Sequence, residues 1–373
     1  MPKINLVPFK NFLQSQQIGG FLLLLCVVVS LLIANSPWGT GFSQLLETEL
    51  GRDFGSVHLT YPVALWINDG LMAIFFLLVG LEIKREIVEG ELSTPKKAAL
   101  PIFAALGGML FPAAIYAAFN AGTPAAGGWG IPMATDIAFA LAVLSMLGNK
   151  VPTSLKVFLS ALAIADDLGA ILVIAVFYTR ELHFEYLGYA GGILLLLLAL
   201  NRFKVTNLAA YLLPGLFLWY FIHHSGIHAT IAGVLLAFTI PTNIGSATSP
   251  LEKLEHAISR PVNFLIMPVF ALANTNIRFT GDMLDGLSSN LGLGIILGLI
   301  AGKTLGVTAF SWVSVKLGIS SLPRKTSWQQ VIGLGMLAGI GFTMSIFVSL
   351  LSFSDIAHQS EAKFAVLCAS VLA

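Results

Sequence analysis

The stretch LKVFLSALAIADDLGAILVIAVF, residues 155–177, is long and apolar enough to cross a bilayer, yet it carries two adjacent carboxylates near its middle. These carboxylates belong to Asp166 and Asp167. An acid at the centre of a membrane helix is disfavoured by roughly 2.5–3.5 kcal/mol, so such acids usually face a polar interior or a water-filled path. The pair therefore indicates a cation site, a proton site, or both.

The composition of the whole chain indicates a membrane environment. Of 373 residues, 56% are hydrophobic and only 10% are charged, which is typical of a polytopic membrane protein and excludes a soluble domain. The net charge of +1 indicates no particular partner, and we expect no nucleic-acid binding.

Apolar segments recur along the chain and predict a single all-α integral membrane domain, residues 1–373, with about twelve transmembrane helices. The segments are approximately residues 18–34, 62–83, 98–119, 131–147, 155–177, 186–200, 208–222, 228–240, 262–273, 291–315, 330–351 and a last one that begins at Ala362. This last segment has twelve residues, or about 18 Å of helix, which is too short to span a bilayer. We therefore expect that the last helix is truncated.

The basic residues predict the orientation of the chain in the membrane. If the N-terminus is cytoplasmic, fifteen of the twenty Lys and Arg residues fall on the inner side. Four fall on the outer side, namely Arg52, Arg180, Arg278 and Lys363. Because inner connections of membrane proteins are enriched in Lys and Arg, we expect a cytoplasmic N-terminus.

The twentieth basic residue, Lys303, lies at the middle of the segment 291–315, near the depth of the Asp pair. A lysine at that depth should find an acid. One interpretation is a structural salt bridge that fastens two helices. The other adds that protonation of the acid, or binding of a cation to it, would release the lysine.

A third acid, Asp136, lies in GWGIPMATDIAFALAVL, residues 128–144. It would be shallow in a regular helix, but Gly128, Gly130 and Pro132 predict an extended approach. Extended chain advances about 3.3 Å per residue against 1.5 Å in a helix, so this approach would carry Asp136 towards the midplane. The neighbouring Thr135 adds a hydroxyl oxygen.

A similar interruption is expected in the segment 330–351, which contains four closely spaced glycines. They are Gly333, Gly335, Gly339 and Gly341. Interrupted segments at corresponding positions in two halves indicate inverted-topology repeats around a site at the midplane. The repeats would be approximately residues 98–177 and 291–373, with two discontinuous helices that cross.

Six stretches, taken together and in order, resemble the NhaA-type sodium/proton antiporters. They are FFLLVGLEIKRE (75–86), ATDIAFAL (134–141), ALAIADDLGAI (161–171), SGIHATIAG (225–233), GKTLG (302–306) and LAGIGFTMSIF (337–347). NhaA is itself a standard example of inverted-repeat architecture, so the repeats and the resemblance are not independent inferences.

The resemblance implies electrogenic exchange of Na⁺ or Li⁺ for protons in a bacterial inner membrane, with no cofactor beyond the transported ions. It assigns the shared ion and proton site to Asp166 and Asp167, with Thr135 as an oxygen ligand. It places Asp136 and Lys303 at the crossing of the broken helices, where they would offset the helix-end dipoles.

The resemblance also implies pH regulation and a homodimer. The residues assigned to the cytoplasmic funnel and pH sensing are Glu82, Arg85, Glu86, Glu255, His256 and, at the outer end of its segment, His228. Dimerisation would use the outer loop 45–61, in which RDFGSVHLTY (52–61) predicts a short hairpin around Gly55.

Other functions account for less of the sequence. A hydrolase could be imagined from His223, His224, Ser225 and His228, but no third member would orient a base, so we expect no enzyme. A channel is harder to exclude, because ion channels also use acidic residues. The main alternative is a sodium-coupled symporter for an organic solute. The predicted midplane, however, offers few aromatic or hydrogen-bonding side chains that could bind such a solute, beyond the acids and Thr135.

Overall fold

The computed structural model describes residues 7–53, 55, 58–179, 181–242, 249–281 and 283–373. Within these ranges the fold is helical apart from two short strands, which confirms the expected all-α class. Six helices are long and apolar enough to cross a membrane, or up to nine spans if each of three bent pairs is counted as one. Twelve crossings stay a prediction.

The chain forms two compact units. Unit 1 contains Met1–Leu25, Thr94–Ala170 and Phe279–Ala373, and unit 2 contains Cys26–Ser93 and Ile171–Arg278. Two helices contribute to both units, α1 (Val7–Ala34) and α7 (Thr153–Phe177).

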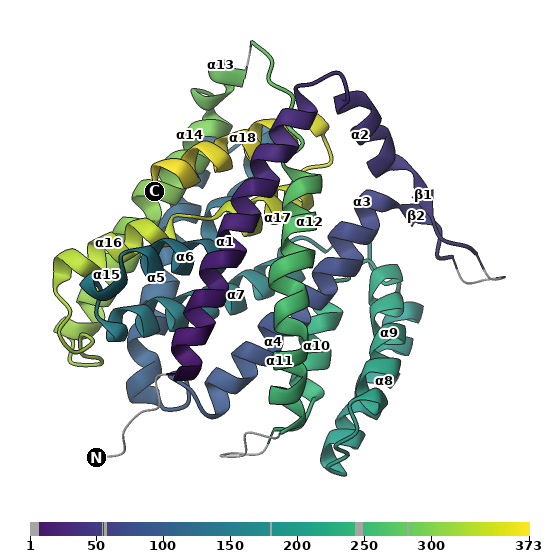
Figure 1. Ribbon diagram of the computed structural model, residues 1–373, viewed down its shortest axis with the longest axis horizontal. Coiled ribbons are helices and arrows are strands. Elements are labelled where there is room, and N and C mark those ends of the chain that lie inside the picture. Colours follow the sequence, from purple (N-terminus) through teal and green to yellow (C-terminus); the bar gives the residue numbers. More distant parts are fainter. Residues whose placement is uncertain (1–6, 54, 56–57, 180, 243–248, 282) are drawn as a thin grey trace. The chain divides into compact units, whose positions relative to one another are not determined.

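Unit 1 is built from helices of very different lengths (Figure 1). Its α-helices are α5 (Pro95–Asn120), α6 (Ile137–Met146), α13 (Met283–Leu287), α14 (Asn290–Leu297), α15 (Lys303–Lys316), α16 (Trp328–Ala338), α17 (Phe342–Ser352) and α18 (Ile356–Leu372). It also has 3-10 helices at Pro124–Met133 and Gly148–Lys150, and a π-helical turn at Gly298–Gly302.

Helices α5 and α15 of unit 1 pack closely against each other. Gly107 of α5 and Gly306 of α15 face each other, and a methyl group on either would overlap the backbone carbonyl of the other. Small residues allow two membrane helices to approach backbone to backbone, where dispersion and weak polar contacts hold them. This contact holds α15 against α5 at Gly306, which lies one turn after Lys303.

Unit 2 contains the remaining elements. They are α2 (Gly39–Glu47), β1 (Glu49–Leu50), β2 (Tyr61–Pro62), α3 (Val63–Leu65), α4 (Met72–Val88), α8 (Phe184–Arg202), α9 (Ala209–His224), α10 (Ile231–Thr239), α11 (Pro250–Pro261) and α12 (Met267–Asn274), with π-helical turns at Trp66–Leu71 and Val262–Ile266. Helix α4 packs on α10, and α8 lies beside α9 (Figure 1).

The outer hairpin differs from its sequence-based expectation. The strands are two residues long and pair antiparallel as Glu49 with Pro62 and Leu50 with Tyr61. They flank the stretch predicted to form the hairpin, and only Tyr61 belongs to both. The ladder stops early because Asp53 accepts backbone hydrogen bonds from Leu59 and Thr60, at 2.9 and 3.1 Å, inside the loop.

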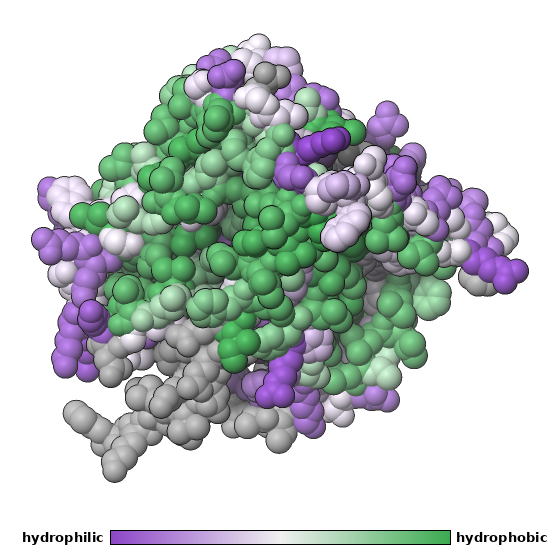
Figure 2. Space-filling view, turned by 45° about the horizontal axis from the view of Figure 1, so that its top comes forward, coloured by the Kyte–Doolittle hydropathy of each residue, from purple (hydrophilic) through white to green (hydrophobic). Residues whose placement is uncertain are grey.

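Apolar residues cover the middle of the face in Figure 2, and hydrophilic residues gather at its margins. Many large apolar side chains are exposed on single helices, as on α8, where Leu195 is 69% and Leu198 is 48% exposed. A contiguous apolar surface of this kind is stable in hydrocarbon and would aggregate in water.

The α5–α15 contact predicts how alanine is tolerated at two glycines of unit 1. Alanine gains about 1 kcal/mol of helix propensity over glycine. At Gly107 the added methyl meets the Gly306 carbonyl, whereas at Gly333 nothing lies within 4 Å. Because overpacking costs about 1–3 kcal/mol, Gly107→Ala should lower the thermal unfolding midpoint in detergent while Gly333→Ala leaves it unchanged or raises it. Equal shifts would contradict the contact.

Candidate functional site

Two helix breaks come together in unit 1. The first lies at residues 134–136, where the 3-10 helix Pro124–Met133 gives way to α6 at a bend of 43°. The second lies at residues 339–341, between α16 and α17, at a bend of 46°. The backbone N–H of Asp136 donates to the carbonyl of Ile340 at 2.7 Å, so the breaks are in direct contact.

The approach to the first break differs from the expected extended chain. Residues 124–133 form a 3-10 helix, and only residues 134–136 are non-helical. Thr123 caps this helix and Pro124 opens it, so the stretch has a helix start signal that outweighs its glycines. A 3-10 helix rises about 2.0 Å per residue, which still exceeds the α-helical rise.

One carboxylate caps the helices that follow both breaks. Oδ1 of Asp136 accepts from the backbone N–H of Phe139 in α6 at 3.0 Å. Oδ2 accepts from the backbone N–H of Thr343 in α17 at 3.1 Å, and also from the hydroxyl of Thr343. Since a helix N-terminus carries partial positive charge and unpaired N–H groups, the Asp136 carboxylate stabilises both.

Lys303 contacts an acid, as its depth predicted. Its Nζ lies 2.6 Å from Oδ2 of Asp166 and 2.9 Å from the hydroxyl oxygen of Thr135, and the Lys303 side chain is fully buried. The Thr135 hydroxyl in turn donates to the carbonyl of Ala338, at the end of α16, at 2.9 Å. The ammonium is thereby linked through Thr135 to the negative end of that helix.

The π-helical turn Gly298–Gly302 immediately precedes Lys303. Such turns are rare and occur often at functional sites, where they change the direction of the following side chain. Gly298 lies against the ring of Pro132 and Gly302 against the backbone and ring of Pro112, so larger side chains would not fit there.

The Asp pair is buried in α7. Asp166 is 1% exposed and Asp167 is 3% exposed. Oδ1 of Asp166 meets no hydrogen-bond donor within the described part of the chain. Together with the Thr135 hydroxyl, the two carboxylates offer the oxygen ligands that hard cations prefer.

Unit 1 thus brings together all five predicted ion-site and compensation residues, Thr135, Asp136, Asp166, Asp167 and Lys303. Among the residues that the structure describes, no group of three or more His, Cys, Asp and Glu side chains is arranged to hold a metal ion.

The predicted funnel residues lie in unit 2. Nε of Arg85 on α4 is 3.3 Å from Oε2 of Glu255 on α11, and Nη2 of Arg85 is 3.6 Å from Oε1 of Glu86. Glu82 is partly buried one turn earlier on α4, and His256 is exposed on α11. Arg85 therefore joins α4 to α11.

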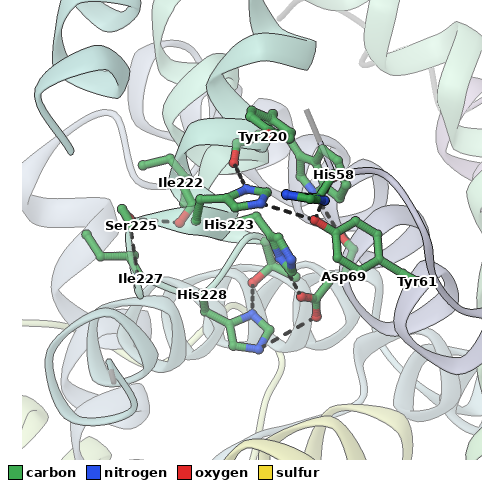
Figure 3. A network of polar contacts seen from close by, with 12 residues as sticks. His58, Tyr61, Asp69, Tyr220, Ile222, His223, Ser225, Ile227 and His228 are labelled. Atoms are coloured by element: carbon green, nitrogen blue, oxygen red, sulfur yellow. Dashed lines mark hydrogen bonds and ion pairs between the residues drawn. The ribbon is translucent and has the colours of Figure 1, made fainter. Parts of the chain in front are cut away.

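His228 belongs to a different polar cluster of unit 2 (Figure 3). Its Nε2 lies 3.9 Å from Oδ1 of Asp69, and its Nδ1 lies 3.1 Å from the hydroxyl of Thr230. The other oxygen of Asp69 is 3.1 Å from Nδ1 of His223. Beside them, burial raises the pKa of Tyr61 to about 12, so its phenol stays protonated and donates to the His58 carbonyl at 3.0 Å.

Two site features were missed at the level of sequence. Thr343 binds Asp136 from 207 positions away, and only its place shortly after Gly341 indicated a helix start there. His223 and Asp69 are 154 positions apart, and neither carried a local pattern that predicts the contact.

Known proteins resemble the chain over nearly its whole length. The model of the family described as Na⁺/H⁺ antiporter 1 matches residues 10–373. Na(+)/H(+) antiporter NhaA 2 of Flavobacterium johnsoniae is 64% identical over 371 residues, covering 99% of this chain and 91% of the relative. The proteins called Na(+)/H(+) antiporter NhaA in Cytophaga hutchinsonii and Bordetella parapertussis are 52% and 51% identical, covering 98% and 97% of this chain and 92% of each relative.

The double cap on Asp136 predicts the effect of removing one hydroxyl. Thr343→Val keeps the side-chain shape but deletes a donor to a buried carboxylate, so it should lower the unfolding free energy by about 1–3 kcal/mol. Thr343→Ser should preserve most of it. The matched control is Thr308→Val, because the hydroxyl of Thr308 has no hydrogen-bond partner in the described chain. A loss of thermal stability as large at Thr308 as at Thr343 would refute the capping role.

Proposed function

Because the chain belongs to the Na⁺/H⁺ antiporter 1 family, we propose that it exchanges Na⁺ for protons across a membrane. The observation that carries the proposal is the buried group of Asp166, Asp167, Thr135 and Lys303 in unit 1. This group offers oxygen ligands and exchangeable protons at one place. Li⁺, which has the same charge and ligand preference, is a second substrate.

The mechanism is competition for the Asp pair. Burial and the closeness of two like charges both favour the protonated carboxyl, whereas a cation favours the ionised one. The site therefore holds either protons or Na⁺. If only these two loaded forms change between inward-open and outward-open states, exchange is obligatory without covalent chemistry.

Lys303 takes part as the internal counter-ion of Asp166. Its ammonium occupies one carboxylate oxygen at 2.6 Å, so a cation that binds Asp166 through both oxygens must displace it. An ammonium without its acid is costly in a buried site, and loss of its proton relieves that cost. Lys303 thus adds to the two acids a third group that can gain or lose a proton.

Alternating access would use the inverted repeats at residues 98–177 and 291–373, within a chain that crosses the membrane about twelve times. The support is that each stretch contains one bent pair, and the two breaks meet at Asp136 and Ile340. In this proposal the breaks cross at the midplane, with Asp136 and Lys303 compensating the helix ends.

The remaining roles follow from family membership. Arg85 and its partners, with Glu82 and His256, would form an inward funnel that senses pH, and His228 would respond to pH at the outer side. The protein would lie in a bacterial inner membrane with a cytoplasmic N-terminus and form a homodimer through the outer loop 45–61.

The ion-site assignment is tested in everted vesicles that lack other antiporters. Adding Na⁺ to an established pH gradient should collapse it, and Asp167→Asn should reduce the rate at least about tenfold, because an amide cannot exchange a proton there. The control is Asp285→Asn, since Asp285 is exposed on α13. Equal activity in Asp167→Asn and wild type would move the site elsewhere, and sodium movement that requires an organic solute would favour the symporter.

Electrogenic exchange is tested separately in proteoliposomes. If more than one proton moves per Na⁺, each turnover transfers net charge, and the potential contributes about 2.3 kcal/mol per charge per 100 mV. A potassium diffusion potential without a pH gradient should then drive Na⁺ movement, with its direction reversing when the potential is reversed. An unchanged Na⁺ flux at either polarity would show electroneutral exchange.

A further inference from the structure

A large apolar pocket lies within unit 2, outside every residue assigned to transport. Its volume is about 680 Å³, and its walls come from α4, α9, α10, α11 and the π-helical turn Trp66–Leu71. Its floor includes the buried Ala232, Leu236 and Leu254. This volume lies within the range of about 300–1,000 Å³ that is typical of ligand pockets in proteins.

The lining lacks the polar groups that orient a small polar ligand. Among the described residues that form it, only Trp66 and Trp219 carry a polar side-chain atom. Both indole N–H groups are already used: Trp66 donates to the Leu50 carbonyl at 2.9 Å and Trp219 to the Asp69 carbonyl at 3.1 Å. Recognition in this pocket must therefore come from shape and apolar contact.

The pocket opens onto an apolar surface. Leu213 and Leu216 of α9, which line it, are 62% and 66% exposed, and Ile74 of α4 is 38% exposed. In a chain that spans a membrane, exposed leucines of this kind contact lipid hydrocarbon. The opening is therefore accessible from the bilayer.

One end of the pocket has the character of a membrane interface. The rings of Trp66 and Trp219 stack with centroids 5.9 Å apart, and Trp219 stacks on His223 at 5.7 Å. Trp219 thereby contacts the polar cluster of Asp69, His223 and His228, which Figure 3 shows. From Trp219 the lining follows α9 back to Leu212, about 10 Å of helix.

We propose that this pocket holds one acyl chain of a membrane phospholipid, with the headgroup beside the Trp66–Trp219 end. An acyl chain matches the apolar lining, the opening towards lipid and the absence of free polar groups in that lining. Tryptophan at the chain–headgroup boundary is the usual arrangement at membrane interfaces. The bound chain fills the gap between α4 and α9 and so stabilises unit 2.

The test uses tryptophan fluorescence in detergent, with a phosphatidylcholine that carries a dibrominated acyl chain as the probe. Bromine quenches indoles only at close contact. The parent protein keeps Trp66 and Trp219, and the other four tryptophans, Trp38, Trp129, Trp312 and Trp328, are replaced by Phe. Quenching should saturate at a single bound lipid per chain.

A matched pair of variants locates the probe. Ile74→Phe with Leu216→Phe adds two rings to the lining and should abolish most of the saturable quenching. Leu195→Phe with Leu198→Phe makes the same change on exposed positions of α8 outside the lining and should leave it intact. Elution volume and unfolding midpoint verify that each variant is folded.

Four outcomes overturn the proposal. The first two are quenching that rises without saturation and equal quenching in both double variants. The third is quenching that is seen in a monomer fraction and lost in a dimer fraction. The fourth is tighter binding of a dibrominated free fatty acid than of the phospholipid. The third would assign the pocket to a second copy of the chain, and the fourth to a single-chain ligand.

Discussion

The arrangement of unit 1 depends on the carboxylate of Asp136. A helix that breaks inside a membrane leaves backbone N–H and C=O groups that no water can satisfy. The Asp136 carboxylate accepts hydrogen bonds from such groups at two helices, namely the backbone N–H groups of Phe139 and Thr343. Its own N–H serves the carbonyl of Ile340, and the Thr135 hydroxyl serves that of Ala338. Each break therefore provides hydrogen-bond partners for backbone groups that the other break leaves unpaired.

The same atoms connect this scaffold to the Asp pair. Thr135 sits between the end of α16 and the ammonium of Lys303, and Lys303 reaches Asp166. A change of charge on Asp166 therefore acts on a helix end that lies three hydrogen bonds away. A buried ion pair contributes little net stability, but leaving one partner alone is costly, so such a pair suits a site whose occupant changes.

The sequence predicted the parts of this site that depend on depth. Asp166 and Lys303 are both central in long apolar segments, and a lysine in hydrocarbon needs an acid, so their contact followed. The sequence also placed both breaks, through Gly and Pro. It did not predict the 3-10 helix before Asp136, because the conformation of a glycine-rich stretch is set by its neighbours, as at Pro132 against Gly298.

The sequence did not predict the contacts between distant polar residues, for a different reason. The partners of Asp136 and Asp69 lie 207 and 154 positions away, and a hydroxyl or an imidazole on a helix has many local alternatives. The sequence did not predict the positions of the two hairpin strands, because hydrogen bonds to Asp53 from within the loop end their pairing. Periodicity carries no information on such hydrogen bonds.

The π-helical turn before Lys303 distinguishes the two proposed repeats, residues 98–177 and 291–373. A π turn takes one more residue than an α-helical turn, so residues beyond Gly298–Gly302 are rotated by about 100° from their place in an unbroken helix. In the proposed inverted repeats, the counterpart of this segment is helix α5, which runs from Pro95 to Asn120 without such a turn. In that proposal, superposing the two repeats requires a gap of one position, at the residue that the π-helical turn adds before Lys303.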